Sequence, residues 1–395
     1  MKILMVSPQF KPIVGGYERA AERLSKGLAS RGHQVVVLAE RRFPDWPYRE
    51  RDHGVDLHRW WCVYKRRLHT FTSLIGLLLY LLRFGQRFDV WHIHHYGVHA
   101  ALSIAIGRLM QRPTVLKLTS SSYGGISEAL RVGRLSKIMT SLHRQASAVA
   151  APSRETALEA RTFGYPAERV YLLQNGVDTN RFKPTSDVQR RWLRAKLQIE
   201  DMPTVIAVGR LVADKNIDGV LAAWAKASTR FSGEWRLVVV GDGPARPALT
   251  KQLTRLGVQD QVRLVGHQSN IEDWMGCADL FVQASHREGL SNTMLEAMAA
   301  GLPVVITAVS GAQECVGETG AGIVVPIGDP DALEGALVAL ASDPSARDRC
   351  GAAARGVVET GFSIERAVDR CEALYRGLVH DSRSPKVPST GETHQ

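Results

Sequence analysis

The spacing of apolar residues predicts strands and helices in alternation from the start of the chain. A short apolar run at Lys2–Val6 predicts a strand, and a helix with a 3.6-residue period is expected at about Tyr17–Arg31. Gly32 is placed to end that helix, and Gln34–Leu38 predicts the next strand. The apolar face of the helix consists of Ala20, Ala21, Leu24 and Leu28.

The same order of elements continues and then begins again near Asp201, after the polar stretch Asn175–Arg191. Before this point we expect further strands at Val90–His94, Thr114–Leu118, Ala148–Ala151 and Val170–Leu173. After it we expect helices at Ile217–Ala227 and Arg246–Leu256, and strands at Thr204–Val208, Trp235–Val240, Val262–Val265, Leu280–Gln283, Pro303–Thr307 and Gly322–Val325. Strands that alternate with helices are typical of parallel sheets with crossover helices, so the sequence predicts two α/β domains.

A chain of 395 residues is long enough for two domains of ordinary size. We expect the first at residues 1–185 and the second at residues 186–362. The helix at 363–378 is expected to return to the first domain, and the polar tail 380–395 to be disordered. Ligands of such sheets bind beyond the carboxyl ends of the strands, so the cleft between the domains is the expected site.

The net charge of +11 predicts an anionic partner. Nucleic acid, an acidic membrane surface and phosphorylated small molecules all satisfy this requirement. Basic residues are densest in the region 41–87, where Lys65-Arg66-Arg67 precedes the apolar run Leu74–Leu82. This run is too short to span a bilayer. A core helix and a helix lying on a membrane surface both remain open.

The five cysteines are scattered and odd in number, without the spacing of metal ligands. This argues against a disulfide framework or a zinc site and favours a reducing compartment. The first apolar run is also too short for a signal peptide, so we expect a cytoplasmic protein. The cysteines are Cys62, Cys277, Cys315, Cys350 and Cys371.

The motif richest in chemistry begins where the predicted strand Leu280–Gln283 ends. Glu288 and Gly289 form a tight loop, and a helix begins near Ser291. The start of a helix offers free N–H groups and a partial positive charge, which suits a phosphate. Glu288 is placed to accept hydrogen bonds from sugar hydroxyls, and Glu296 lies further along the helix, within reach of a ribose diol.

Other loops after strands carry weaker signals. The loop that begins at Gly209 holds two cations, Arg210 and Lys215, which could stabilise the charge of a departing diphosphate. The pair Gly15-Gly16 allows a ligand to approach the backbone closely, but a full GxGxxG is missing and a plain tight turn fits equally well. The turn Gly241–Pro244 is similarly unspecific.

These strings together resemble retaining glycosyltransferase family 4, which has the GT-B fold of two doubly wound Rossmann-like domains facing across a cleft. The resemblance covers nearly the whole chain except the tail and the region 41–87. It rests on GGYERAAERLSKGLASRGHQV at 15–35, NGVD at 175–178, GRLVADKN at 209–216, VVVGDGP at 238–244 and EGLSNTMLEAMAAGLPVV at 288–305.

The resemblance implies transfer of a sugar from a nucleoside-diphosphate donor to an acceptor hydroxyl, with retention at the anomeric carbon and without a metal cofactor. Arg210, Lys215 and Glu288 would be the catalytic residues, the first two at the diphosphate and Glu288 at the donor sugar. The remaining donor-binding positions would be Gly15, Gly16, Gly209, Gly289, Leu290, Ser291 and Glu296, the last at the ribose.

The sequence departs from the family pattern on the acceptor side. Many members carry a histidine at the end of the strand that matches Thr114–Leu118, and Thr119 stands there in this chain. His92, His94 and His95 end a different strand that is expected to face the same cleft. The candidates for the group that assists the acceptor hydroxyl are therefore His94, His95 and Thr119, and the sequence leaves the choice open.

No metal motif is expected, because the one Asp-x-Asp string has another explanation. In Asp329-Pro330-Asp331 the first aspartate is placed to cap a helix and the proline to occupy its first position.

Three alternatives to a transferase stay open on the residues alone. They are a sugar-nucleotide epimerase of the same fold, a non-catalytic nucleotide-sugar binder, and a basic nucleic-acid-binding protein. The last is disfavoured because the basic region is interleaved with leucines and not with aromatic residues. The same region favours a saccharide or lipid-linked acceptor at an anionic membrane face, as in the assembly of cell-surface polysaccharides or glycolipids.

Overall fold

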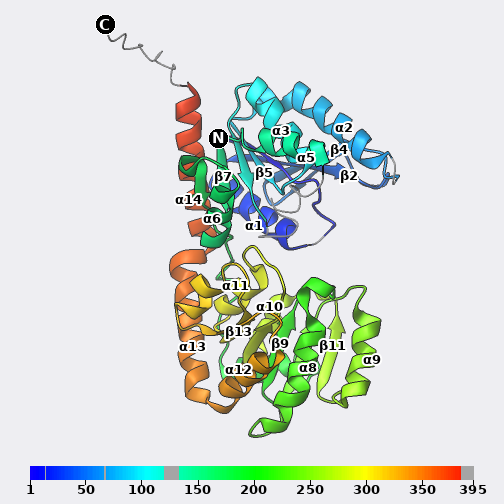
Figure 1. Cartoon of the computed structure of the whole chain (residues 1–395), viewed down its shortest axis with the longest axis vertical. Coiled ribbons are helices and arrows are strands. Elements are labelled where there is room, and N and C mark those ends of the chain that lie inside the picture. Colours follow the sequence, from blue (N-terminus) through cyan, green and yellow to red (C-terminus); the bar gives the residue numbers. More distant parts are fainter. Residues whose placement is uncertain (14, 66–67, 120–132, 384–395) are drawn as a thin grey trace.

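The computed structural model describes residues 1–13, 15–65, 68–119 and 133–383, and it shows two α/β halves stacked along the long axis of the molecule (Figure 1). Within these residues the N-terminal half contains an eight-stranded sheet and the C-terminal half a six-stranded sheet. The predicted α/β class with two parallel sheets is therefore confirmed.

The sheet of the N-terminal half has the order β3-β4-β2-β1-β5-β6-β7-β8. Its strands are β1 (Lys2–Val6), β2 (Gln34–Arg41), β3 (Arg49–Asp52), β4 (Val55–Trp61), β5 (Val90–His94), β6 (Thr114–Lys117), β7 (Ala148–Ala151) and β8 (Val170–Leu172). All neighbours are parallel except β3 and β4, which form an antiparallel hairpin. His53 and Gly54 join them with φ angles of 47° and 81°, the geometry of a tight two-residue hairpin loop. This hairpin lies in the region 41–87, for which the apolar pattern predicts no strand.

Successive side chains of each strand point to opposite faces of this sheet, and helices bury both faces. Ile3 and Met5 of β1 pack toward α1 (Gly16–Ser30) and the C-terminal helix α14 (Ile364–Arg383). Leu4 and Val6 pack on the opposite side, and the helices there include α2 (His69–Phe84), α3 (Val98–Leu109) and α6 (Arg154–Thr162), with α5 (Gly133–His143) against α3. Helices on both faces are the usual cover of a parallel sheet.

The C-terminal half repeats the plan with the strand order β11-β10-β9-β12-β13-β14, all parallel. Its strands are β9 (Thr204–Val208), β10 (Arg236–Val240), β11 (Val262–Gly266), β12 (Leu280–Gln283), β13 (Val304–Thr307) and β14 (Gly322–Val325). Its helices are α7 (Asp187–Lys196), α8 (Ile217–Ala227), α9 (Arg246–Leu256), α10 (Ile271–Gly276), α11 (Asn292–Ala299), α12 (Pro330–Ser342) and α13 (Pro344–Val357). Asp329 caps α12 by accepting hydrogen bonds from the N–H groups of Asp331 and Ala332, so the expected helix start at Asp329-Pro330-Asp331 is confirmed.

The two passages of the chain between the halves lie side by side. The N–H of Val177 donates to the carbonyl of Phe362, and the N–H of Ile364 donates to the carbonyl of Val177, each at 2.9 Å. From Ile364, α14 runs back along the N-terminal half (Figure 1), where it packs on α1 and β5.

Helix α14 is longer than the sequence predicts, because its apolar face continues through Leu378 and Val379, which pack on the core. It ends at Arg383. The expectation that the chain is disordered from 380 is therefore wrong for residues 380–383, and residues 384–395 lie outside the described part of the chain.

Helix α2 contains the apolar run Leu74–Leu82 and buries one side of it in the core. Leu77 and Leu81 are fully buried under the sheet, whereas Leu79 and Leu82 remain 61% and 49% exposed. Among the described helices, none combines the length and apolar composition required to cross a bilayer.

Strand order determines where a site can form. In the N-terminal sheet, successive strands are added on one side of β1 up to β4 and then on its other side from β5 onward. In the C-terminal sheet the same switch occurs between β9 and β12. Loops that leave neighbouring strands on opposite faces at such points open a crevice at the carboxyl ends of the strands. The loops after β1, β5, β9 and β12 are therefore the ones expected to hold a ligand.

The loop after β9 is held by close contact between backbones, which yields a test of the fold. Gly241 has a φ of 143°. A Cβ there would lie 1.8 Å from the carbonyl oxygen of Gly209. Because Gly241→Ala would force the two backbones apart, we expect it to lower the free energy of unfolding by roughly 2 kcal/mol or more. Urea unfolding followed by tryptophan fluorescence measures the change.

Gly335→Ala is the matched control. Gly335 lies inside α12, and a Cβ there would have no neighbour within 4 Å. Alanine is a better helix former than glycine, so this variant should gain about 0.5–1 kcal/mol. Equal unfolding midpoints for the two variants would contradict the strain at Gly241.

Candidate active site

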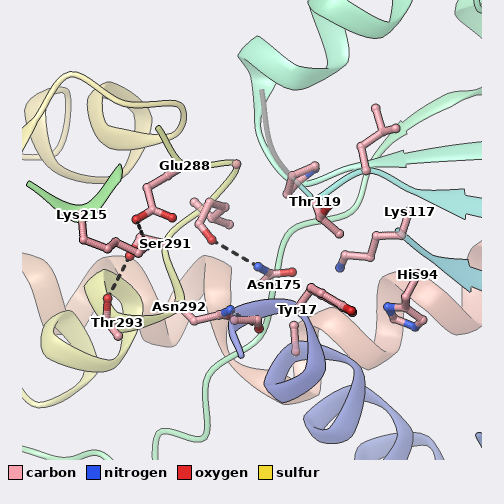
Figure 2. A pocket seen from close by; sticks show the side chains of 16 residues that line it. Tyr17, His94, Lys117, Thr119, Asn175, Lys215, Glu288, Ser291, Asn292 and Thr293 are labelled. Atoms are coloured by element: carbon pink, nitrogen blue, oxygen red, sulfur yellow. Dashed lines mark hydrogen bonds and ion pairs between the residues drawn. The ribbon is translucent and has the colours of Figure 1, made fainter. Parts of the chain in front are cut away.

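Of the cavities between the halves, two that share lining residues lie at the carboxyl ends of the strands. The smaller, about 120 Å³, is lined from both halves (Figure 2). The larger, about 340 Å³, is lined by the loops after β9 and β10 and by the start of α1. The cavities share the lining residues Gly16, Lys215, Asn292 and Thr293.

The C-terminal half contributes an ion pair to the smaller cavity. Nζ of Lys215, at the end of the loop after β9, pairs with Oε1 of Glu288 in the loop after β12 (Figure 2). The two loops are also tied by a hydrogen bond of 2.8 Å from the N–H of His286 to the carbonyl of Asp214. The structure therefore brings together two of the residues to which the sequence assigns catalysis.

Gln283 orients this group, and sequence reasoning missed it. Its Nε2 donates to Oε1 of Glu288 at 2.8 Å, and its Oε1 accepts from Oγ of Ser291 at 2.7 Å. One buried amide at the end of β12 thus connects the carboxylate to the start of α11. The available signal was a polar residue that ends an otherwise apolar strand, Leu280-Phe281-Val282-Gln283.

The start of α11 forms the adjoining wall. Ser291 is the N-cap, and its Oγ accepts from the N–H of Met294 at 3.2 Å. The first N–H groups of a helix have no partner within the helix and carry a partial positive charge. Gly289, Leu290 and Ser291 all line the smaller cavity, so this backbone faces the space where an anion would be bound.

Arg210 and Gly209 line the larger cavity. Arg210 is exposed there, across from Glu18 of α1. Burial raises the pKa of the Glu18 carboxyl, and the positive charges of Arg210 and Arg42 oppose the shift. Arg210 therefore contributes positive potential to the cavity from the C-terminal half.

Glu296 makes a contact across the cleft that the sequence did not predict. Its Oε1 pairs with Nη2 of Arg23, on α1, at 2.6 Å, and its side chain is only 3% exposed. Its second oxygen, Oε2, has no hydrogen-bond partner among the described residues. Glu296 lines the larger cavity, and this oxygen is buried in its wall.

Glycines of the N-terminal half approach the same wall. Gly15 is the N-cap of α1 and lines the larger cavity, and Gly16 lines both cavities. The carbonyl of Gly16 accepts a hydrogen bond of 2.8 Å from Nδ2 of Asn292 at the start of α11. Asn175, in the first passage between the halves, donates to the carbonyl of Leu290 at 3.3 Å.

The proposed acceptor side divides into residues that reach the cavity and one that does not. His94 and Thr119 line the smaller cavity opposite Glu288 (Figure 2). Burial, together with the nearby charge of Lys117, lowers the pKa of His94 to about 3, so its imidazole is neutral. His95 is not part of the lining. The ring of His95 stacks on the ring of Tyr17 at a centroid distance of 5.5 Å, and Tyr17 does line the cavity.

Comparison with known proteins gives consistent matches over both halves. The sequence profile of glycosyl transferases group 1 matches residues 189–357, and that of glycosyltransferase family 4 matches residues 14–181. D-inositol 3-phosphate glycosyltransferase 1 of Catenulispora acidiphila is 31% identical over 91% of this chain and 86% of its own length.

Solved structures show the same fold at lower identity. HepE of Anabaena in complex with UDP superimposes with a TM-score of 0.78 at 20% identity, over 95% of this chain and all of that one. WaaG, described as a glycosyltransferase involved in lipopolysaccharide biosynthesis, gives a TM-score of 0.75 at 18% identity over the same shares of the two chains.

The contact between Arg23 and Glu296 predicts how closure of the cleft depends on charge. Arg23→Met would leave a nearly buried carboxylate without its cation, a state that is strongly unfavourable unless water reaches it. We therefore expect the variant to populate a more open arrangement of the halves. Small-angle X-ray scattering should report this as an increase in the radius of gyration.

Arg31→Met serves as the control for this measurement. Arg31 pairs with Asp369 at 2.5 Å within the N-terminal half, between α1 and α14, so its loss should leave the cleft unchanged. If the Arg23→Met and Arg31→Met variants scatter identically, the pair does not hold the halves together.

Proposed function

The chain belongs to glycosyltransferase family 4 and has the GT-B fold, and we propose that its cleft transfers a sugar from a nucleoside-diphosphate donor to an acceptor hydroxyl with retention at the anomeric carbon. Enzymes of this family use nucleotide sugars. Membership therefore favours the transferase over the epimerase and the nucleic-acid-binding protein that the residues alone left open.

The observation that carries the proposal is the meeting of Lys215, Glu288 and the start of α11 in one cavity. In this proposal the diphosphate lies against the N-terminal end of α11, between Lys215 and Arg210. The donor sugar extends into the smaller cavity, where Glu288 accepts hydrogen bonds from its hydroxyls. The bound donor replaces the direct pairing of Lys215 with Glu288, since the phosphate takes the cation and the sugar takes the carboxylate.

Transfer then needs one bond to break and one to form on the same face of the sugar. The bond from the anomeric carbon to the diphosphate oxygen breaks as the bond to the acceptor oxygen forms, and the acceptor proton passes to the departing phosphate. Lys215 and Arg210 stabilise the negative charge that grows on the leaving group. Hydrogen bonds from Gln283 fix the position of Glu288 relative to the start of α11, and this keeps the sugar and the phosphate correctly placed.

The nucleoside lies in the larger cavity in this proposal. Ribose hydroxyls donate to Oε2 of Glu296, the oxygen that lacks a partner among the described residues, while Arg23 retains Oε1. HepE, a structural relative, was solved with UDP, which supports a nucleoside diphosphate as the group bound here. The Gly15-Gly16 backbone covers the donor from the N-terminal half.

We further propose that α2 rests on an anionic membrane and gives access to a lipid-linked acceptor. Phe71 and Leu79 of this helix are 65% and 61% exposed, and Leu82 is exposed beside them. Exposed basic residues flank the apolar face, among them Lys65 and Arg83, while Arg66 and Arg67 lie outside the described residues. A helix with apolar and basic neighbours of this kind binds at the lipid headgroups. A role in cell-surface polysaccharide or glycolipid assembly follows, and the fold shared with WaaG supports it.

Removal of the catalytic cation tests the reaction. With a donor chosen by thermal shift against a panel of nucleotide sugars, Lys215→Ala and Glu288→Ala should each lower kcat by about 10²–10³-fold, because charge stabilisation or sugar positioning is lost. Release of nucleoside diphosphate measures turnover, and circular dichroism should show an unchanged fold.

Lys226→Ala is the matched control for the loss of a lysine in the same half. Lys226 is exposed on α8 and pairs with Asp331 at 2.7 Å, away from both cavities. Its turnover should equal that of wild type. Undiminished turnover in Lys215→Ala would remove the basis of the proposed site.

The membrane proposal is tested on α2. Leu79→Ser combined with Leu82→Ser should abolish co-sedimentation with vesicles rich in anionic lipid, because the apolar face that enters the headgroups is lost. Leu158→Ser is the control, since Leu158 is 64% exposed on α6. Failure of the wild-type protein to bind such vesicles would end the proposal.

A further inference from the structure

Lys117 is a buried amine at the inner end of the smaller cavity. It is the last residue of β6, and only 5% of it is exposed. Among the described residues, Nζ makes one hydrogen bond, a long contact of 3.5 Å to the carbonyl of Leu173. Within the described residues it forms no ion pair with a carboxylate.

Among the residues that the structure describes, the surroundings of Lys117 do not supply a counter-charge. Among the described residues, the titratable groups that act on it or respond to it are His92 and His94 of β5 and Cys371 of α14. Both histidines are neutral, because burial holds the pKa of His94 at about 3 and that of His92 well below its usual value. Burial likewise lowers the pKa of Lys117. A buried ammonium is costly unless an anion and hydrogen bonds compensate it.

The side chain is directed into the space where transfer is proposed to occur. Figure 2 shows Lys117 reaching into the cavity beside His94 and below Thr119, on the side opposite Lys215 and Glu288. Three further buried atoms of lining residues, Nε2 of His94, Oδ1 of Asn175 and Oδ1 of Asn292, have no hydrogen-bond partner among the described residues. The lining of the cavity thus presents the Lys117 amine together with three unsatisfied polar atoms.

We propose that Lys117 binds an anionic group of the acceptor, so that the enzyme acts on acceptors carrying a phosphate or carboxylate close to the hydroxyl that receives the sugar. This inference rests on the proposed transferase function and adds the class of acceptor. Lys215 and Arg210 bind the donor diphosphate from the C-terminal half, and Lys117 binds the second anion from the N-terminal half. A neutral acceptor would cover Lys117 and leave its charge uncompensated, so it is bound less well.

The test uses the full chain saturated with the nucleoside diphosphate that gives the largest thermal shift. Two pairs of compounds are titrated by calorimetry at millimolar concentrations: glycerol 3-phosphate against glycerol, and glucuronate against glucose. Wild type should bind at least one anionic member about tenfold more tightly than its neutral counterpart, and the two pairs distinguish phosphate from carboxylate. Lys117→Met should remove this preference and leave the affinity for the neutral compounds within about twofold.

Two variants keep the result interpretable. Lys117→Gln replaces Lys117→Met if the latter fails to fold, and Lys251→Met, on the exposed face of α9, controls for the loss of one positive charge. The thermal shift by nucleoside diphosphate should be the same in all of them. If wild type shows no such shift, the proposed function itself fails, whatever the acceptor result.

Three results would overturn the inference while leaving the donor site intact. The first is no preference of wild type for either anion, including no binding at all. The second is an equal loss of affinity for the anionic and the neutral compounds in Lys117→Met, which would indicate a structural role for Lys117. The third is weaker nucleoside diphosphate binding in Lys117→Met, which would place Lys117 at the donor.

Discussion

The ends of parallel strands impose the constraint on which the rest of this enzyme depends. All strands of the C-terminal sheet run the same way, so the loops after β9 and β12 must emerge at one edge. The reversal of strand order between them opens a crevice at that edge, and the N-terminal sheet repeats the arrangement between β1 and β5. The halves are stacked along one axis (Figure 1), and residues from both crevices line one cavity. Residues as far apart in sequence as Gly16 and Asn292 are then in hydrogen-bonding contact.

Charged residues of the two halves face one another across this cleft, and some of them are also proposed to bind the donor. Arg23 of the N-terminal half pairs with Glu296 of the C-terminal half, and the charge of Arg210 acts on Glu18 from the other side. The pair Lys215–Glu288 lies within the C-terminal half and faces the cavity. Each carboxylate is thus held by a cation and retains the capacity to accept hydrogen bonds from a ligand. The same groups that bring the halves together are those proposed to bind the donor.

The N-terminal half differs in character from its partner. Its cavity wall is formed by buried groups with few partners, Lys117 and His94 above all, whereas the C-terminal wall is a connected network centred on Gln283. A connected network suits a constant task such as holding a diphosphate. Polar atoms that lack partners mark the place where the substrate supplies the missing interactions. The exposed apolar face of α2 belongs to the same half.

Much of this enzyme follows from the sequence, because its main elements are local. The period of apolar residues predicted most strands and helices of both sheets, since each element buries one face or both. The strings that contain Arg210, Lys215, Glu288 and Glu296 carried the resemblance to the family. The sequence did not reveal the β3–β4 hairpin, because its polar strand Arg49–Asp52 has no apolar alternation. Nor could it show that Gln283 orients Glu288, that Arg23 pairs with Glu296, or that Lys117 lines the smaller cavity while His95 stacks on Tyr17 outside that lining. These facts depend on which side chains from distant segments face one another and which are removed from water, and only the packing of the two halves decides that.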